Sequence, residues 1–284
     1  MHKKSKTDND MAELINIPFT RKGSVGDITV YQRGSKTYMR SRYNMTQQRR
    51  LSERQLRQCT RMNNLVRLWT SFPLGYRPVF QCRSENTTSY NLFVTYAMQA
   101  HPVYMTKQMR SEAACVVTDV AVAQGSLPEI TVSHDGIAPI TDIALGWLTI
   151  GTGTTVSQFA RAVVENNYDY LPGDRLRYYL CKQWRLEPQG IPMVNVSCDE
   201  LTLDVNDLRP LHEVVSHGEG FAQRGGRLAA SREVVGGMAW VHIRHSGPDM
   251  LLSTQRLVCN NDALMQQYGS EEAFDAACRS YREK

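Results

Sequence analysis

The sequence lacks the motifs that mark the common enzyme classes. No GxxxxGK[ST] phosphate loop, GxSxG nucleophile elbow, HExxH zinc motif or Rossmann glycine fingerprint occurs in its 284 residues. Each motif holds a reacting or phosphate-binding group at a fixed spacing, so nucleotide-dependent, serine-hydrolase and zinc-protease chemistries are set aside. We therefore expect a protein that is not an enzyme and requires no cofactor.

Long apolar runs, an export signal and cysteine pairs are missing as well. No stretch approaches the ~18 consecutive apolar residues of a membrane helix, and the first ten residues, MHKKSKTDND, include no apolar signal-peptide segment. The seven cysteines are scattered, without a CxxC pair, and most lie in apolar stretches. This pattern argues against disulfides and a structural zinc site, so we predict a cytoplasmic protein without membrane contact.

Positive charge, in contrast, is abundant and concentrated in residues 33–67. Ten basic residues and a single acid, Glu53, give this stretch a net charge of +9, and because the chain totals +5, the remainder carries −4. A localised charge of this kind is typical of a surface that meets an acidic partner.

A β-hairpin followed by a long helix is predicted to carry this charge. Two runs rich in β-branched and aromatic residues flank the polar break Arg33-Gly34-Ser35, a pattern typical of a hairpin. A helix follows at residues 52–69 with Ser52 as its N-cap. Spacings of three and four residues predict its buried face, made of Leu56, Cys59, Met62, Val66 and Trp69. The same spacing on the opposite side predicts an exposed arginine face, made of Arg50, Arg54, Arg57 and Arg61.

The fold class we predict is α+β and rich in strands. Residues 1–13 are expected to be a disordered tail, and residues 14–110 a hairpin and helical region with a second helix at 88–99. Beyond that point the chain is rich in Val, Ile and Thr, broken by Gly and Pro, as strands are. Residues 111–284 are therefore predicted to form an antiparallel β-sandwich-like domain with one inserted helix at 156–166 and a C-terminal helix at 270–282.

The basic hairpin and helix form the predicted binding site. Arginines along a helix reach successive phosphates, and tyrosines among them stack on unpaired bases. The alternative is a solvated helix face, or arginines paired with acids of the same chain or of a neighbouring subunit. No helix-turn-helix, RRM or zinc-finger pattern accompanies the charge. The residues of the predicted site are Tyr31, Arg33, Lys36, Tyr38, Arg40, Arg42, Arg50, Arg54, Arg57 and Arg61.

Other chemistry-bearing residues have simpler interpretations. The stretch from Gly151 to Thr155 precedes a capped helix but lacks the lysine of a phosphate loop, so we expect a turn. His242 and His245 fall on opposite faces of a predicted strand and are interpreted as surface residues rather than metal ligands. Cys59 lies on the predicted apolar face of its helix, so we expect core packing rather than catalysis. The four tryptophans are predicted to be core anchors: Trp69, Trp147, Trp184 and Trp240.

Short motifs throughout the chain resemble an uncharacterised protein family of gut bacteria, known as a domain of unknown function. The N-terminal motif is Gly-x-Val-Gly-x4-Tyr-x2-Gly-x5-Arg-Ser, represented here by Gly23, Val25, Gly26, Tyr31, Gly34, Arg40 and Ser41. A Gln/Arg-rich helix around Gln55-Leu56-Arg57-Gln58 follows it. The resemblance implies a β-rich fold with an N-terminal hairpin and helix, and an association with phages or other mobile elements. It implies no catalytic residue.

Together these observations predict a non-enzymatic structural or assembly protein of a phage or mobile element. Its basic hairpin and helix are expected to contact nucleic acid or an acidic partner subunit, and an oligomeric assembly is compatible with this prediction. The alternative is a cell-surface or carbohydrate-binding β-sandwich protein, which would require an export signal that the sequence does not display.

Overall fold

The computed structural model describes residues 12–13, 23–25, 28–33, 36–41, 51–81, 87–216 and 218–282. Contacts divide the chain into an N-terminal unit (residues 1–50 with 83–87) and a main unit (residues 51–82 with 88–284). The boundary expected near residue 110 is therefore not where the chain divides. Helix α1 (Glu53–Ser71) packs against α7 (Glu271–Arg282) at the far end of the sequence, and that contact joins the regions before and after residue 110.

The N-terminal unit contains a four-stranded antiparallel sheet in the order β1-β4-β3-β2. Strands β3 (Ile28–Arg33) and β4 (Lys36–Ser41) pair along their whole length, which confirms the predicted hairpin. The outer strands are β1 (Ala12–Glu13) and β2 (Gly23–Val25). The tail expected at residues 1–13 lies outside the described residues except for its last two, which pair with β4.

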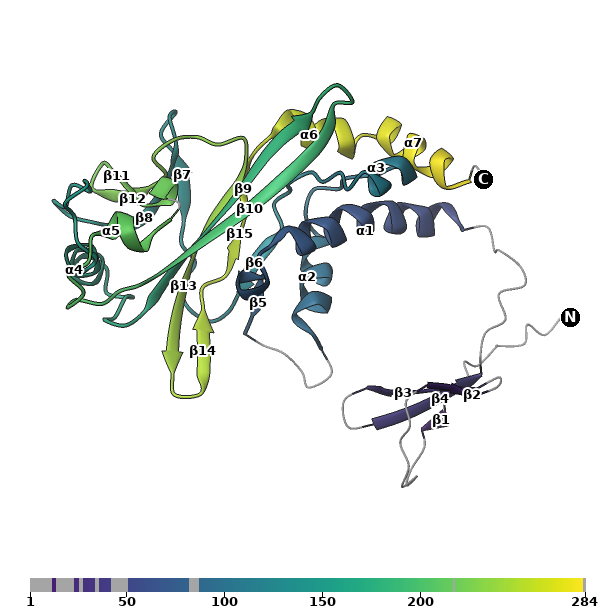
Figure 1. Cartoon of the computed structure of the whole chain (residues 1–284), viewed down its shortest axis with the longest axis horizontal. Helices are drawn as coiled ribbons and strands as arrows, with labels where there is room; N and C mark the ends of the chain where they lie inside the picture. The colour runs from purple at the N-terminus through teal and green to yellow at the C-terminus, as the bar shows by residue number, and fades with distance from the viewer. Residues whose placement is uncertain are drawn as a thin grey trace, which may run out of the picture. The chain divides into compact units, whose positions relative to one another are not determined.

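A central antiparallel sheet organises the main unit (Figure 1). Its order is β10-β9-β13-β14, and β16 pairs with the start of β13. The strands are β9 (Arg175–Leu186), β10 (Ile191–Thr202), β13 (Gly236–Ser246), β14 (Asp249–Leu252) and β16 (Val258–Asn260). Because successive side chains of a strand point to opposite faces, Tyr179 and Val241 enter one hydrophobic core, whereas Tyr178 and Trp240 enter another.

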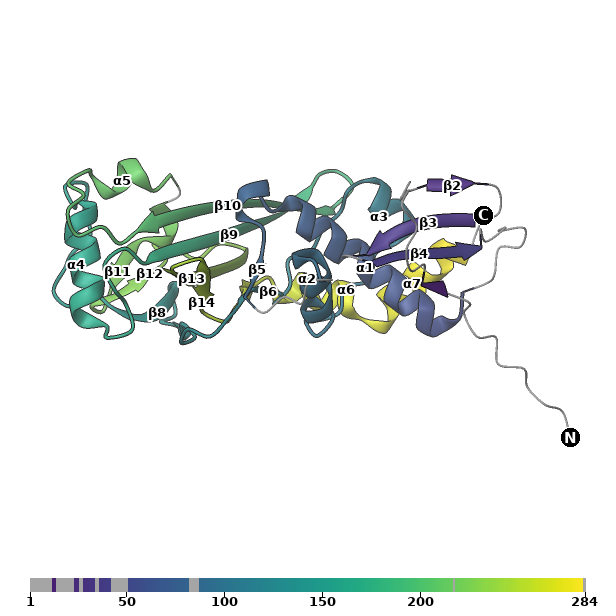
Figure 2. The same cartoon turned by 90° about the horizontal axis from the view of Figure 1, so that it is seen from below.

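The two cores have different coverings. The first lies against α1, α2 (Ser89–Ala97) and a small sheet of β5 (Val79–Phe80), β6 (Ala121–Gln124) and β15 (Gln255–Arg256). The second lies against α4 (Val156–Asn166) and a second sheet. That sheet contains β7 (Val132–His134), β8 (Pro139–Ala144), β11 (Ala222–Arg224) and β12 (Arg227–Ala229). Within the main unit, α4 and α5 (Leu211–Val214) lie at one end, and α1, α3 (Lys107–Ser111), α6 (Asp262–Gly269) and α7 at the other (Figure 2).

The predicted α+β, strand-rich and sandwich-like class is confirmed. The helices expected at 52–69, 88–99, 156–166 and 270–282 correspond to α1, α2, α4 and α7. The short helices α3, α5 and α6 were not predicted, and β5 pairs with β6 in parallel rather than antiparallel fashion. Among the described residues, none of the helices combines the length and apolar character that crossing a membrane requires.

Helix α1 buries a different face from the one predicted. Cys59 is exposed, whereas Thr60 is fully buried. Thr60 is able to lie in the core because its hydroxyl donates to the carbonyl of Leu56 at 2.8 Å, so no polar group is left unpaired. The buried residues of the helix are Leu56, Thr60, Asn64, Leu65, Leu68 and Trp69.

The tryptophans also divide differently from the prediction. Trp69 and Trp240 are buried, and the indole N–H of Trp240 donates to the carbonyl of Gly220. Trp184 is 45% exposed near the end of β9, and Trp147 is fully exposed in the loop after β8. The expectation of four core anchors was therefore wrong for these two, because the apolar residues around Trp147 turn inward while its own side chain does not.

An extended segment, residues 114–118, is fully buried without belonging to any strand. The N–H groups of Ala114 and Cys115 donate to the backbone carbonyls of Met109 and Pro192, and side-chain amides bond much of the remaining backbone. Asn64 of α1 accepts from the N–H of Val116 and donates to its carbonyl, both at 2.8 Å. Gln183 of β9 accepts from Val117 N and donates to the carbonyl of Cys115, and Asn261 donates to the carbonyl of Val117. The segment thus joins α1, the central sheet and the start of α6.

Replacing Asn64 should test this connection. Asn64→Ala leaves a buried N–H and a buried carbonyl of Val116 without partners, and we expect the free energy of unfolding in urea to fall by about 2–5 kcal/mol. Asn195→Ala, at an exposed position of β10, is the control and should change it by less than ~0.5 kcal/mol. Equal effects of the two substitutions would contradict the assigned role of Asn64.

Candidate functional site

The hairpin brings four of the predicted site residues, Tyr31, Lys36, Tyr38 and Arg40, to one face. In the register of β3 and β4, Tyr31 lies opposite Tyr38, and Arg33 opposite Lys36. Cross-strand partners share a face. The rings of Tyr31 and Tyr38 stack at 5.7 Å, and the guanidinium of Arg40 lies 5.6 Å from the centre of the Tyr31 ring. We call the surface of Tyr31, Lys36, Tyr38 and Arg40 the hairpin face.

The hairpin face differs sharply from the reverse side of the same strands. Lys36 and Arg40 are exposed, and both tyrosines are half-buried. The reverse side carries the register pairs Ile28–Ser41, Val30–Met39 and Gln32–Thr37, which are uncharged and non-aromatic. The aromatic and cationic residues of the described hairpin are therefore segregated on one side. Arg42 and Arg50 of the predicted site lie outside the described residues.

The predicted arginine face of α1 is largely engaged within the chain. Arg57 donates to both carboxylate oxygens of Glu271 at 3.0 Å and to the hydroxyl of Tyr104, and it lies 3.8 Å above the ring of Phe274. These bonds to Glu271 raise the pKa of Arg57. Arg57 thus connects α1 with α7.

Arg61 is engaged by backbone groups rather than by an acid. One terminal nitrogen of its guanidinium donates to the carbonyls of Met98 at 2.8 Å and Ala100 at 3.1 Å, at the C-terminal end of α2. Cations are favourable at that end of a helix because its last carbonyls have no helical partners. Of the described arginines in the predicted helix face, Arg54 is the exposed one. The alternative of arginines paired inside the chain therefore holds for Arg57 and Arg61.

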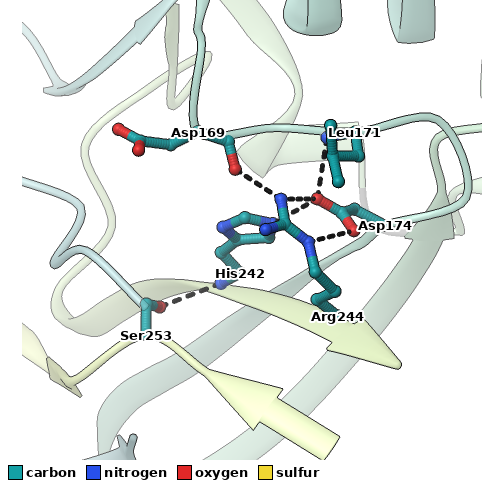
Figure 3. A network of polar contacts seen from close by, with 6 residues as sticks. All are labelled: Asp169, Leu171, Asp174, His242, Arg244 and Ser253. Atoms are coloured by element: carbon teal, nitrogen blue, oxygen red, sulfur yellow. Dashed lines mark hydrogen bonds and ion pairs between the residues drawn. The ribbon is translucent and has the colours of Figure 1, made fainter. Parts of the chain in front are cut away.

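A buried polar network, which the sequence had not indicated, lies at the end of β13 (Figure 3). His242 is 1% exposed and its Nε2 lies 2.7 Å from Oδ2 of Asp174. Arg244 donates to both oxygens of the same carboxylate and to the carbonyl of Asp169. Burial alone would raise the pKa of Asp174, but the bonds from His242 and Arg244 outweigh it and lower the pKa to about 2. The expectation that His242 is a surface residue was wrong.

This network anchors the loop that follows α4. Tyr170 stacks on His242 with ring centres 4.1 Å apart, and the N–H of Leu171 donates to Asp174. Asn167 binds both the N–H and the carbonyl of Ala144, so the loop after β8 is attached to the loop after α4. Beyond these attachments, Tyr168 is 93% exposed and Trp147 fully exposed. Two exposed aromatic side chains therefore lie on loops whose backbones are held in place by these contacts.

Ser253, His242 and Asp174 do not have the bonds of a serine–histidine–aspartate triad. Ser253 is buried beside His242, but its hydroxyl accepts from the backbone N–H of His242 and not from the imidazole. The alternation of side chains along β13 could have predicted that His242 is buried. His242 occupies the same alternation as Met238 and Trp240, which points into the second core.

A pocket of about 220 Å³ between β7, β8, β13 and β16 contains His134, Glu233 and Cys259. The N–H of Gly136 donates to Nδ1 of His134, so Nε2 carries the proton and donates to Glu233 at 3.1 Å. Burial raises the pKa of Cys259 to about 12. Both imidazole nitrogens are thus occupied and the thiol stays protonated at neutral pH, so this trio is not arranged as an activated cysteine–histidine pair. Among the described residues, no group of three or more His, Cys, Asp or Glu is placed to hold a metal ion.

Comparisons with protein-family models, curated proteins and solved structures found no match to this chain. The resemblance to a gut-bacterial family therefore stays a prediction.

Substitutions of two arginines of α1 should distinguish an arginine that stabilises the fold from one that is only exposed. Arg61→Gln removes the donor that binds two carbonyls at the end of α2, and we expect a loss of about 1–3 kcal/mol in the free energy of unfolding. Arg54→Gln removes the same charge from an exposed position one helical turn N-terminal to Arg57 and should change the free energy of unfolding by less than ~0.5 kcal/mol. A neutral Arg61→Gln would show that its bonds are not needed and would return this residue to the candidate binding surface.

Proposed function

We propose that the protein is a non-enzymatic assembly protein whose hairpin face binds single-stranded nucleic acid. The observation that carries the proposal is the strand register, which gathers two stacked tyrosines and the exposed cations Lys36 and Arg40 on one side of one hairpin. Proteins that bind single strands combine aromatic rings, on which bases stack, with cations that track the phosphates.

Two features favour a single strand over a duplex. Stacking on Tyr31 or Tyr38 requires a base whose face is accessible, and base–aromatic stacking contributes about 1–3 kcal/mol per base. The engagement of Arg57 and Arg61 inside the main unit leaves no continuous row of free arginines along α1 of the kind that would follow a duplex backbone. The proposed contact is therefore short, covering a few nucleotides.

The cysteines support a proposed residence in the cytoplasm. The six described cysteines are free thiols. Burial raises the pKa of Cys115 to about 12, and it also raises that of Cys181. Buried, protonated thiols of this kind suit a reducing compartment. An origin in a phage or mobile element is part of the same proposal, and the genes beside this one would test it.

Binding of a labelled 20-nucleotide oligo(dT), followed by fluorescence anisotropy, tests the hairpin face. Removing two phosphate contacts with Lys36→Gln and Arg40→Gln together should weaken binding and flatten the slope of log affinity against log salt by about 1.4. The control is Arg54→Gln with Arg279→Gln, which removes the same charge from exposed positions of the main unit and should leave the slope near that of the unmodified protein.

Two outcomes of this binding experiment would contradict the proposal. If the unmodified protein ignores oligo(dT) at about 50 mM salt but binds polyglutamate through Lys36 and Arg40, its partner is an acidic protein. Equal losses in the hairpin variant and in the control would mean that net charge alone governs binding and that the hairpin face is not the site.

Carbohydrate binding is a second candidate function, favoured by the exposed Trp147 and Tyr168. Aromatic rings present a flat apolar face with a polar edge, which suits the alternating C–H and O–H surface of a sugar ring. Both rings project from loops fixed by Asn167 and by the Asp174 network. Because the loop backbones are held in place, little backbone conformational entropy would be lost when a ligand binds there.

Affinity electrophoresis in gels that contain soluble xylan or β-glucan tests this second function. Trp147→Ala should abolish any retardation of the protein, and Tyr168→Ala should reduce it. Leu208→Ala is the control, because Leu208 is 77% exposed and lies beside the opposite end of α4, where its neighbours Asp207 and Arg209 bond the first residues of that helix. A protein that migrates normally in every gel would remove carbohydrate binding as a candidate.

A further inference from the structure

A second pocket, unrelated to the hairpin face, lies between α1 and the end of α3 in the main unit. Its volume is about 220 Å³, and it is lined by the polar residues Asn63, Arg67, Thr70 and Arg110 together with the apolar residues Val66, Met105, Ala113 and Ala114. Pockets that enclose drug-sized ligands measure ~300–1,000 Å³. This pocket is below that range and is of a size suited to a small polyatomic ion.

The charges around the pocket are all of one sign. No acidic residue lines it, and neither Arg67 nor Arg110 forms an ion pair with any part of the chain that the structure describes. The nearest acid along the sequence, Glu112, accepts from the side chain of Gln108. Two arginines therefore line one pocket without a carboxylate to neutralise them, in contrast to Arg57, Arg177 and Arg244, which all bind carboxylates.

The backbone holds one of these arginines in place. Nε of Arg67 donates to the carbonyl of Ala113 at 3.1 Å, which leaves its two terminal nitrogens for other acceptors. Ala113 has φ of 60°, in the left-handed region that an alanine rarely adopts. This conformation terminates α3, with the N–H of Ala113 bonded to the carbonyl of Arg110 and that of Ala114 to the carbonyl of Met109. A strained residue at a pocket wall is a common feature of ligand sites.

From the size, the paired guanidinium groups and the absence of acids, we infer that this pocket binds a phosphate-type oxyanion. The planar fork of an arginine matches two oxygens of a phosphate, and such charge-assisted bonds are stronger than neutral ones. The half-buried Arg67 and the exposed Arg110 supply the N–H donors that bind the anion in this proposal. The anion is either a free phosphate or the terminal phosphate of a nucleic acid strand.

Isothermal titration with inorganic phosphate and with pyrophosphate, at constant ionic strength set by chloride, tests the site. The unmodified protein should bind, and Arg110→Gln should weaken binding at least about tenfold, which is the effect of losing one charge-assisted bond. Arg110 is exposed, so this variant should fold normally. Arg67→Lys keeps the charge but loses the planar fork and should also weaken binding, whereas Arg54→Gln is the matched control on the same helix and should not.

Oligo(dT) with and without a 5′ phosphate distinguishes the two sources of the anion. Tighter binding of the phosphorylated strand, abolished by Arg110→Gln, would identify the end of a strand as the ligand, and equal binding of both strands alongside phosphate binding would identify the free anion. No heat of binding for phosphate or pyrophosphate, or full binding by Arg110→Gln, would overturn the inference. Lys36→Gln with Arg40→Gln should leave phosphate binding intact, so failure of the hairpin proposal is separable from failure of this one.

Discussion

The fold of the main unit depends on three side-chain amides that hydrogen-bond one buried segment. Residues 114–118 are enclosed on all sides, and an enclosed backbone must have its polar groups paired. Asn64, Gln183 and Asn261 supply these partners from α1, β9 and the start of α6. Elements far apart in the sequence are thereby held to a common strip of chain. These bonds hold α1 against the face of the central sheet that carries Tyr179 and Val241.

Arginine has two different uses in this protein. On α1, Arg57 and Arg61 satisfy a carboxylate and two helix-terminal carbonyls and connect that helix to α7 and α2. On the hairpin, Arg40 lies over an aromatic ring and remains exposed. Arginine at helical spacing is therefore an ambiguous signal, because the same periodicity that exposes a residue to solvent also presents it to a neighbouring helix. The charge that remains for a partner is smaller than the net charge of the stretch indicates.

The sequence was sufficient to predict the features that depend on neighbouring residues, such as turns and helix caps. The break at Arg33-Gly34-Ser35 predicted the hairpin, and Ser52 and Thr155 predicted the starts of α1 and α4, where both form capping boxes. Contacts between distant residues were not predictable in this way. Glu271 lies 214 positions from Arg57, and nothing local marks it as a partner. Thr60 and Asn64 look like surface residues until the groups that they bond are known, and so the buried face of α1 was misplaced.

In the anchored loops around Trp147 and Tyr168, the residues that hold the backbone in place are different from the residues that face solvent. Most binding surfaces use the same residues for both. The loop backbones are held in place by hydrogen bonds of Asn167, Asp174, His242 and Arg244. None of these bonds involves the side chains of Trp147 and Tyr168. Substitutions at the tips therefore change what the surface presents without changing how it is supported. Such a surface is suited to diversification, in the way that variable loops on a rigid framework acquire new ligands while the framework stays the same.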